Sequence, residues 1–125
     1  MNARATSFAT LRDLRAFIGC LRKGNTFRDC LQVGDNGTGA WGDNTATLRV
    51  PLVALPAAEL IDRWGSSAAG RGKMVRVEVE NCIPFHATVG DIAPAGIIDL
   101  NPAALVAAGL PSDCELDRPA KWEWV

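Results

Sequence analysis

Two neighbouring stretches of the chain alternate apolar and polar residues as half-buried β-strands do. Within residues 74–80, valines at every second position alternate with arginine and glutamate. The alternation resumes over residues 83–89 after a tight turn, interrupted by Pro84. A period of two sends successive side chains to opposite faces. The pattern predicts two strands with one face on a core, and it leaves His86 on the other face, toward solvent or a cleft.

Two shorter stretches predict further strands. Residues 48–55 are apolar but contain Pro51, which is typical of an edge or bulged strand. Residues 121–125 alternate so that both of their tryptophans fall on one face.

Helical spacing appears first over residues 10–22, where Thr10 is placed to cap the start and Gly24 to follow the end. Its apolar positions are Leu11, Leu14, Phe17, Ile18 and Leu21. This face either packs on its own domain, which we favour, or docks a partner. Residues 25–33 form a connector or a second short helix.

Two more helices are predicted. One runs from Pro56 to Trp64, and Gly65 stops it. The other follows Asn101, which caps it. The intervening residues 66–73 predict a solvated loop.

The composition restricts the function classes. A length of 125 residues suits one domain, and a net charge of −1 gives no electrostatic case for nucleic-acid binding. No apolar run is long enough for a membrane helix, so we expect no membrane partner. The N-terminus lacks the apolar core of a signal peptide. We therefore expect synthesis in the cytoplasm, with any outside action reached by a non-classical route.

The cysteines do not predict a metal site. None of the four, at positions 20, 30, 82 and 114, lies in a C-x-x-C pair, and His86 is the only histidine. We expect no metal or other cofactor. Buried reduced thiols are favoured, while the even count also permits one or two disulfides.

Candidate chemistry gathers in residues 89–102 and 34–45. The first stretch places Asp91 at the end of one strand and Asp99 at the start of another, just before the last helix. The second stretch is rich in glycine and carries Trp41, Asp43, Asn44 and Thr45. Such a mixture is typical of a ligand-contacting loop, although a hairpin turn anchored by Trp41 fits as well.

These stretches resemble a known family. Gly90-Asp91-Ile92-Ala93-Pro94 and Gly96-Ile97-Ile98-Asp99-Leu100-Asn101 are similar to the N-D-R-G-P and R-I-I-D-L-S signature of rare lipoprotein A, a peptidoglycan lytic transglycosylase. Expansins and family 45 glycoside hydrolases are its relatives. The resemblance covers residues 43–109, but Gly90 stands in place of asparagine and Ile92-Ala93 in place of Arg-Gly.

The resemblance implies a mainly β (α+β) fold, a six-stranded double-psi β-barrel with short helices. Residues 1–33 lie outside it. We therefore expect an N-terminal helical extension over 1–33, packed on the barrel, and the barrel domain over 34–125.

The resemblance also implies a cell-wall glycan-cleaving enzyme, a lytic transglycosylase or glycoside hydrolase. Asp91 matches the transglycosylase acid and Asp99 matches the aspartate of expansins and family 45 enzymes. Asp43 is the candidate for activating water. Trp41 would stack on a sugar, with Asn44, Thr45 and His86 as further glycan contacts.

Two alternatives stay open. Asp99 could serve the turn before the last helix and have no catalytic role. The whole barrel could be a non-catalytic, expansin-like glycan-binding or structural module, because a fold does not fix a function. Either way the expected partner is a polysaccharide such as peptidoglycan. A phage-borne or secreted protein would also need a delivery or virion partner, for which the N-terminal helix is the candidate.

Overall fold

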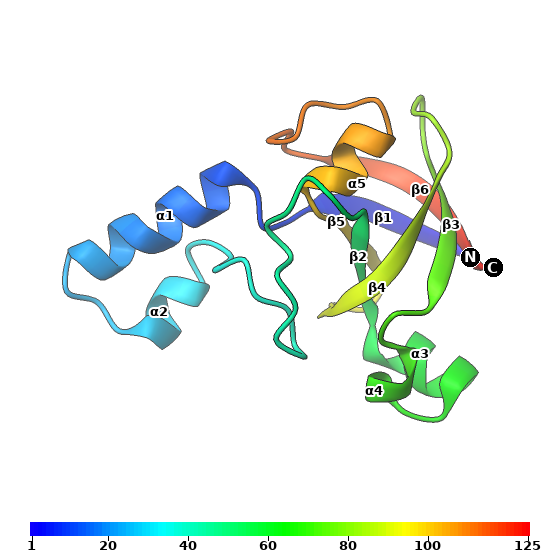
Figure 1. Ribbon diagram of the computed structural model, residues 1–125, viewed down its shortest axis with the longest axis horizontal. Coiled ribbons are helices and arrows are strands. Elements are labelled where there is room, and N and C mark those ends of the chain that lie inside the picture. The colour runs from blue at the N-terminus through cyan, green and yellow to red at the C-terminus, as the bar shows by residue number, and fades with distance from the viewer.

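The computed structural model describes all residues, 1–125, and shows a closed barrel with a helical hairpin beside it (Figure 1). Around the barrel the strand order is β1-β5-β2-β4-β3-β6. The strands are β1 (Asn2–Ser7), β2 (Leu52–Pro56), β3 (Met74–Val79), β4 (Phe85–Ala93), β5 (Ile97–Leu100) and β6 (Asp117–Trp124). The helices are α1 (Leu11–Arg22), α2 (Phe27–Leu31), α3 (Ala57–Trp64), α4 (Ser67–Gly70) and α5 (Pro102–Ala107).

Two strand pairs of the barrel are parallel, β1 with β5 and β2 with β4, and the remaining pairs are antiparallel. The predicted six-stranded barrel with short helices is confirmed. The strand predicted as an edge is instead central, since β2 lies between β4 and β5. Pro51 precedes it and therefore breaks no ladder, while the predicted irregularity is a register shift between Val53 and Ala54.

The barrel interior is filled by the alternating side chains that the pattern predicted. The three valines of β3 are buried there together with residues of β2, β5 and α5, among them Leu55, Ile98 and Leu105. On β6, Trp122 is buried and its ring contacts that of Trp124 edge to face, with centroids 5.1 Å apart. Burial of this apolar surface is the main stabilising term.

The N-terminal region departs from the predicted extension over residues 1–33. Residues 2–7 form β1, which pairs with β5 and β6 inside the barrel. The alternation in this segment is short and weakly apolar, so the strand was not predicted. Its pairing partners lie about a hundred positions away along the chain. The helices α1 and α2 do form, but they project to one side of the barrel and contact mainly each other (Figure 1).

A disulfide joins the two helices of this hairpin, from Cys20 to Cys30, with the two Cα atoms 5.5 Å apart. The favoured prediction of reduced, buried thiols is therefore wrong for this pair. Cys82 and Cys114 are free and half-buried.

The helix ends follow the predicted signals. Thr10 and Asp13 form a capping box on α1, and Gly65 ends α3 in the left-handed conformation. Residues 66–73 are not wholly a loop, because Ser66 caps the short helix α4. None of the helices has the length and apolar character needed to cross a membrane.

Candidate functional site

Four residues form a row across four adjacent strands. Ala54 on β2 pairs with Asp91 on β4 at one side and with Asp99 on β5 at the other. Asp99 in turn pairs with Thr6 on β1. Paired residues on neighbouring strands project to the same face. We call Asp91, Ala54, Asp99 and Thr6 the aspartate row.

The aspartate row lies on the outer wall of the barrel. The chain neighbours of its members, including Ala5, Val53 and Ile98, point into the barrel core, so alternation directs the row outward. Two strand spacings separate the backbones of Asp91 and Asp99, which is roughly 10 Å. Asp91 lies within β4 instead of at its end, and its pairing with Ala54 places it in the same row as Asp99.

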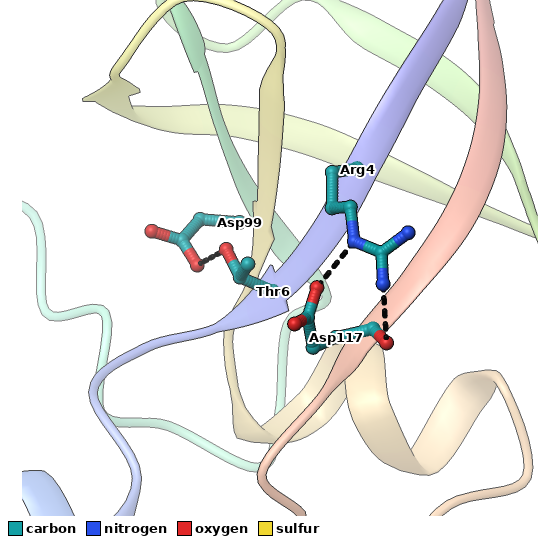
Figure 2. Close-up of polar contacts among 4 residues, drawn as sticks. All are labelled: Arg4, Thr6, Asp99 and Asp117. Atoms are coloured by element: carbon teal, nitrogen blue, oxygen red, sulfur yellow. Dashed lines mark hydrogen bonds and ion pairs between the residues drawn. The ribbon is translucent and has the colours of Figure 1, made fainter.

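Asp99 has the most perturbed carboxyl group of the chain. Its pKa is raised to about 6, first by burial and then by the negative charges of Asp35, Asp13 and Asp91. The Thr6 hydroxyl donates a hydrogen bond to Oδ1 of Asp99 and acts in the opposite direction, lowering the pKa (Figure 2). Asp99 can therefore carry a proton close to neutral pH.

A nearby cation is held away from Asp99. Arg4 lies two residues before Thr6 on β1 and thus on the same outer face. Its guanidinium turns to β6, where Nε donates to Oδ1 of Asp117 at 2.5 Å and Nη2 donates to the Asp117 carbonyl at 3.3 Å (Figure 2). No basic side chain contributes to the pKa of Asp99, so no positive charge offsets the rise in that pKa.

Asp91 ties a loop to the barrel wall. Its Oδ1 accepts hydrogen bonds from the backbone N–H groups of Ala40 and Ile92, both at 2.8 Å. Ala40 belongs to the glycine-rich loop, and Trp41 follows it directly. Trp41 is half-buried against the barrel core. The loop that was predicted to contact a ligand thus meets the aspartate row at Asp91.

Two further carboxylates, on Asp35 and Asp13, lie near the row and were not predicted as site residues. Burial raises the pKa of Asp35, and the charges of Asp91 and Asp13 raise it further. Its Oδ1 accepts the Gly37 N–H at 2.7 Å, which opposes the rise. Asp13 comes from the first turn of α1. These carboxylates do not form a group of the kind that could hold a metal ion.

Asp43 is separate from this cluster. Its carboxylate accepts two hydrogen bonds from Arg71, at 2.9 and 2.6 Å, and this contact lowers its pKa. Asp43 and the exposed Asn44 line an open groove of about 450 Å³ that includes Gly90, the chain neighbour of Asp91, but no member of the aspartate row. The structure therefore does not bring Asp43 to Asp91 and Asp99, and a water-activating role for it has no geometric support.

Two other predicted contacts also lie outside the row. Thr45 is fully buried and its hydroxyl has no hydrogen-bond partner, so it faces no ligand. His86 is exposed at the start of β4, opposite Arg76. Asp91 is five positions further along the strand, a distance of roughly 16 Å. Its polar-face position was predicted correctly, but it does not line the row.

The sequence did contain signals for the residues that were missed. Ala3, Ala5 and Ser7 alternate with Asn2, Arg4 and Thr6, a period of two that indicates a strand. Asp35 stands in an Asp-Asn-Gly turn of the glycine-rich loop. Nothing in the sequence showed that these segments meet Asp99.

Comparison with solved structures identifies the barrel. An expansin of Clavibacter michiganensis matches with a TM-score of 0.55 and 20% sequence identity, over 100% of this chain and 50% of that one. An aspartate-to-asparagine variant of a Clavibacter michiganensis expansin, crystallised with cellohexaose, matches with a TM-score of 0.55 and 17% identity, again over 100% and 50%. A Streptomyces papain inhibitor matches with a TM-score of 0.51 and 21% identity, over 98% and 92%.

These likenesses concern the fold. The chain has the six-stranded double-psi β-barrel that expansins contain, as the resemblance predicted, and it spans about half the length of the expansins it matches. No family model and no curated protein matches the sequence.

Proposed function

We propose that this barrel binds a cell-wall polysaccharide along the aspartate row and that Asp99 delivers a proton to a glycosidic oxygen. The observation that carries the proposal is the Asp99 carboxyl itself, half-buried, bonded to Thr6, and with a pKa raised to about 6. A carboxyl group with this pKa can be both protonated and reactive near neutral pH.

Cleavage of a glycosidic bond requires such a group. Positive charge develops at the anomeric carbon as the bond to the leaving oxygen breaks, and that oxygen must take up a proton. Asp99 would donate it. The surrounding negative charges of Asp35 and Asp91 would also favour the cationic transition state.

A lytic transglycosylase needs only one such residue, according to the family resemblance. The Asp99 proton passes to the leaving oxygen, the bond from the anomeric carbon to that oxygen breaks, and a hydroxyl of the same sugar attacks the anomeric carbon. The hydroxyl proton then returns to the Asp99 carboxylate, so atoms and charge balance. This route needs no second carboxylate, and it is therefore compatible with the ion pair between Asp43 and Arg71.

The non-catalytic alternative uses the same surface. Cellohexaose in complex with an expansin of the same fold supports a glycan-binding barrel, and binding alone would need no proton transfer. In that case the row would contact sugar hydroxyls, with Trp41 as a stacking side chain beside Asp91.

The test separates binding from cleavage. The purified chain is incubated with insoluble peptidoglycan, cellulose and chitin, and both sedimented protein and released soluble fragments are measured. Asp99→Asn and Asp91→Asn are compared with Asp62→Asn, a matched change at an exposed aspartate of α3. Release by wild type and Asp62→Asn but not by Asp99→Asn supports the enzyme. Sedimentation without release supports the binding module. If the chain neither sediments with a glycan nor releases fragments, both the enzyme and the binding module are refuted.

A second candidate function is protease inhibition. The papain inhibitor resembles the chain over nearly the whole length of both proteins. The expansins, in contrast, match it over only half of their own length. The test is the hydrolysis of a chromogenic peptide by papain at rising concentrations of the chain. Inhibition at near-stoichiometric concentration would support this function, and unchanged rates at a large excess would exclude it.

A further inference from the structure

The hairpin of α1 and α2, residues 11–33, carries apolar side chains that no other part of the protein covers. Six large ones are between 37% and 61% exposed: Leu11, Ile18, Leu21, Phe27, Leu31 and Val33. Six exposed large apolar side chains are many for a segment of 23 residues. Exposed apolar side chains that cluster usually mark a binding surface.

Three of these side chains share one side of α1, and Phe27 packs against that helix through Phe17. At 100° per residue, Leu11, Ile18 and Leu21 lie within about a quarter-turn of one another on α1. On α2, Phe27 meets the buried Phe17 edge to face, with ring centroids 5.2 Å apart, and Leu31 lies one turn further on. The Cys20–Cys30 disulfide fixes the two helices in this arrangement.

The hairpin is also basic, whereas the rest of the chain is acidic. Residues 11–33 contain five basic and two acidic side chains, a net charge of +3, and the remaining residues contain eight and twelve, a net charge of −4. Arg15 and Arg22 directly border the Leu11–Ile18 side of α1 on the helical projection. Arg12 pairs with Glu115, while Arg15, Arg22, Lys23 and Arg28 make no ion pair.

We propose that the hairpin binds the surface of an anionic lipid membrane. The apolar side chains would enter the boundary between headgroups and acyl chains, and the free cations would contact lipid phosphates, as in amphipathic helices that lie on membranes. This revises the expectation of no membrane partner and does not depend on the proposed glycan chemistry.

The charge argues against other occupants. A second copy of the chain would bring one +3 surface against another and be repelled. A neutral glycan would gain nothing from four unpaired cations. An anionic bilayer satisfies both the charge and the apolar side chains, and the net charge of −4 on the barrel would be repelled from the same surface.

The experiment is sedimentation of the full, oxidised chain with vesicles of phosphatidylcholine alone or mixed with phosphatidylglycerol. The test variants are Arg15→Gln with Arg22→Gln, and Phe27→Ser. The control variants are Ile83→Ser and Val106→Ser, which remove equally exposed apolar side chains from the barrel domain. Circular dichroism verifies that each variant is folded.

We expect wild type and both controls to bind the anionic vesicles and not the neutral ones. Each arginine removed should lower the partition coefficient about fivefold, corresponding to about 1 kcal/mol per cation near a charged surface. Phe27→Ser should weaken binding as well. The proposal is overturned if wild type binds neither vesicle, if the hairpin and control variants bind equally well, or if the hairpin instead drives dimerisation that its variants abolish.

Discussion

Thr6 and Asp99 are paired residues on the parallel strands β1 and β5, and the threonine hydroxyl donates a hydrogen bond to the aspartate carboxylate. The bond favours the charged form of Asp99, while burial and three neighbouring carboxylates favour the protonated form. The balance gives a pKa of about 6.

Replacing Thr6 should raise the pKa of Asp99. Thr6→Val keeps the shape of the side chain but removes the donor, so the carboxylate loses the contact that lowers its pKa. Thr6→Ser keeps the hydroxyl and should behave as wild type. The pKa can be followed by the carboxyl ¹³C chemical shift of Asp99 during a pH titration. A lower pKa in Thr6→Val would contradict the assignment.

Asp99 should destabilise the fold at neutral and alkaline pH. The folded-state pKa of Asp99 lies above its unfolded value, so the folded protein favours the protonated carboxyl. The stability that this preference contributes is fully present below about pH 4 and is lost as pH rises through about 6, where the buried carboxyl becomes charged. Asp99→Asn should therefore increase the free energy of unfolding by about 2 kcal/mol at pH 8 and change it little at pH 4. Urea unfolding at both pH values measures this, and equal effects at the two would argue against a raised pKa.

Releasing Arg4 should lower the pKa of Asp99. Arg4 is held by Asp117, and with Asp117→Asn its guanidinium would be free to approach Asp99 from the same face of β1. The same carboxyl titration measures the change. Adding Arg4→Gln to Asp117→Asn should abolish it, and persistence of the shift in the double variant would mean that Arg4 is not its cause.

Asn101 should be the most costly polar residue to remove. It is fully buried, accepts from the N–H groups of Ala104 and Leu52 at 2.9 Å, and donates to the carbonyls of Thr45 and Val50 at 3.0 and 3.1 Å. Asn101→Ala should lower the free energy of unfolding by about 3 kcal/mol, because it leaves buried groups without partners.

The matched control for this change is Thr26→Ala, which removes the exposed cap of α2. It should cost about 1 kcal/mol or less. Comparable losses for Asn101→Ala and Thr26→Ala in chemical denaturation would show that Asn101 acts only as a helix cap.

Local patterns along the sequence predicted those elements whose signals lie within one segment. The valines of β3, the capping box at Thr10 and the cap at Asn101 each need only neighbouring residues, and all are confirmed. The barrel itself came from the family resemblance, which also pointed to Asp91 and Asp99.

What remained hidden depends on contacts between distant segments. The role of Thr6 follows from a parallel pairing with a strand more than ninety residues away. Asp43 looked like a partner of the other aspartates, but its position is set by Arg71, which stands in a segment predicted to be only a solvated loop. The Cys20–Cys30 disulfide, the one formed among four cysteines, likewise depends on how the two short helices α1 and α2 pack.

The most direct test of the account is the pH dependence of glycan cleavage by wild type and Asp99→Asn. Soluble fragments released from peptidoglycan are quantified from pH 4 to pH 9, with protein sedimentation on the same glycan as the binding control. The account predicts that wild-type release falls as pH rises through about 6, where Asp99 loses its proton, and that Asp99→Asn binds the glycan but releases nothing. Equal release by Asp99→Asn, or release that increases through this range, would contradict it.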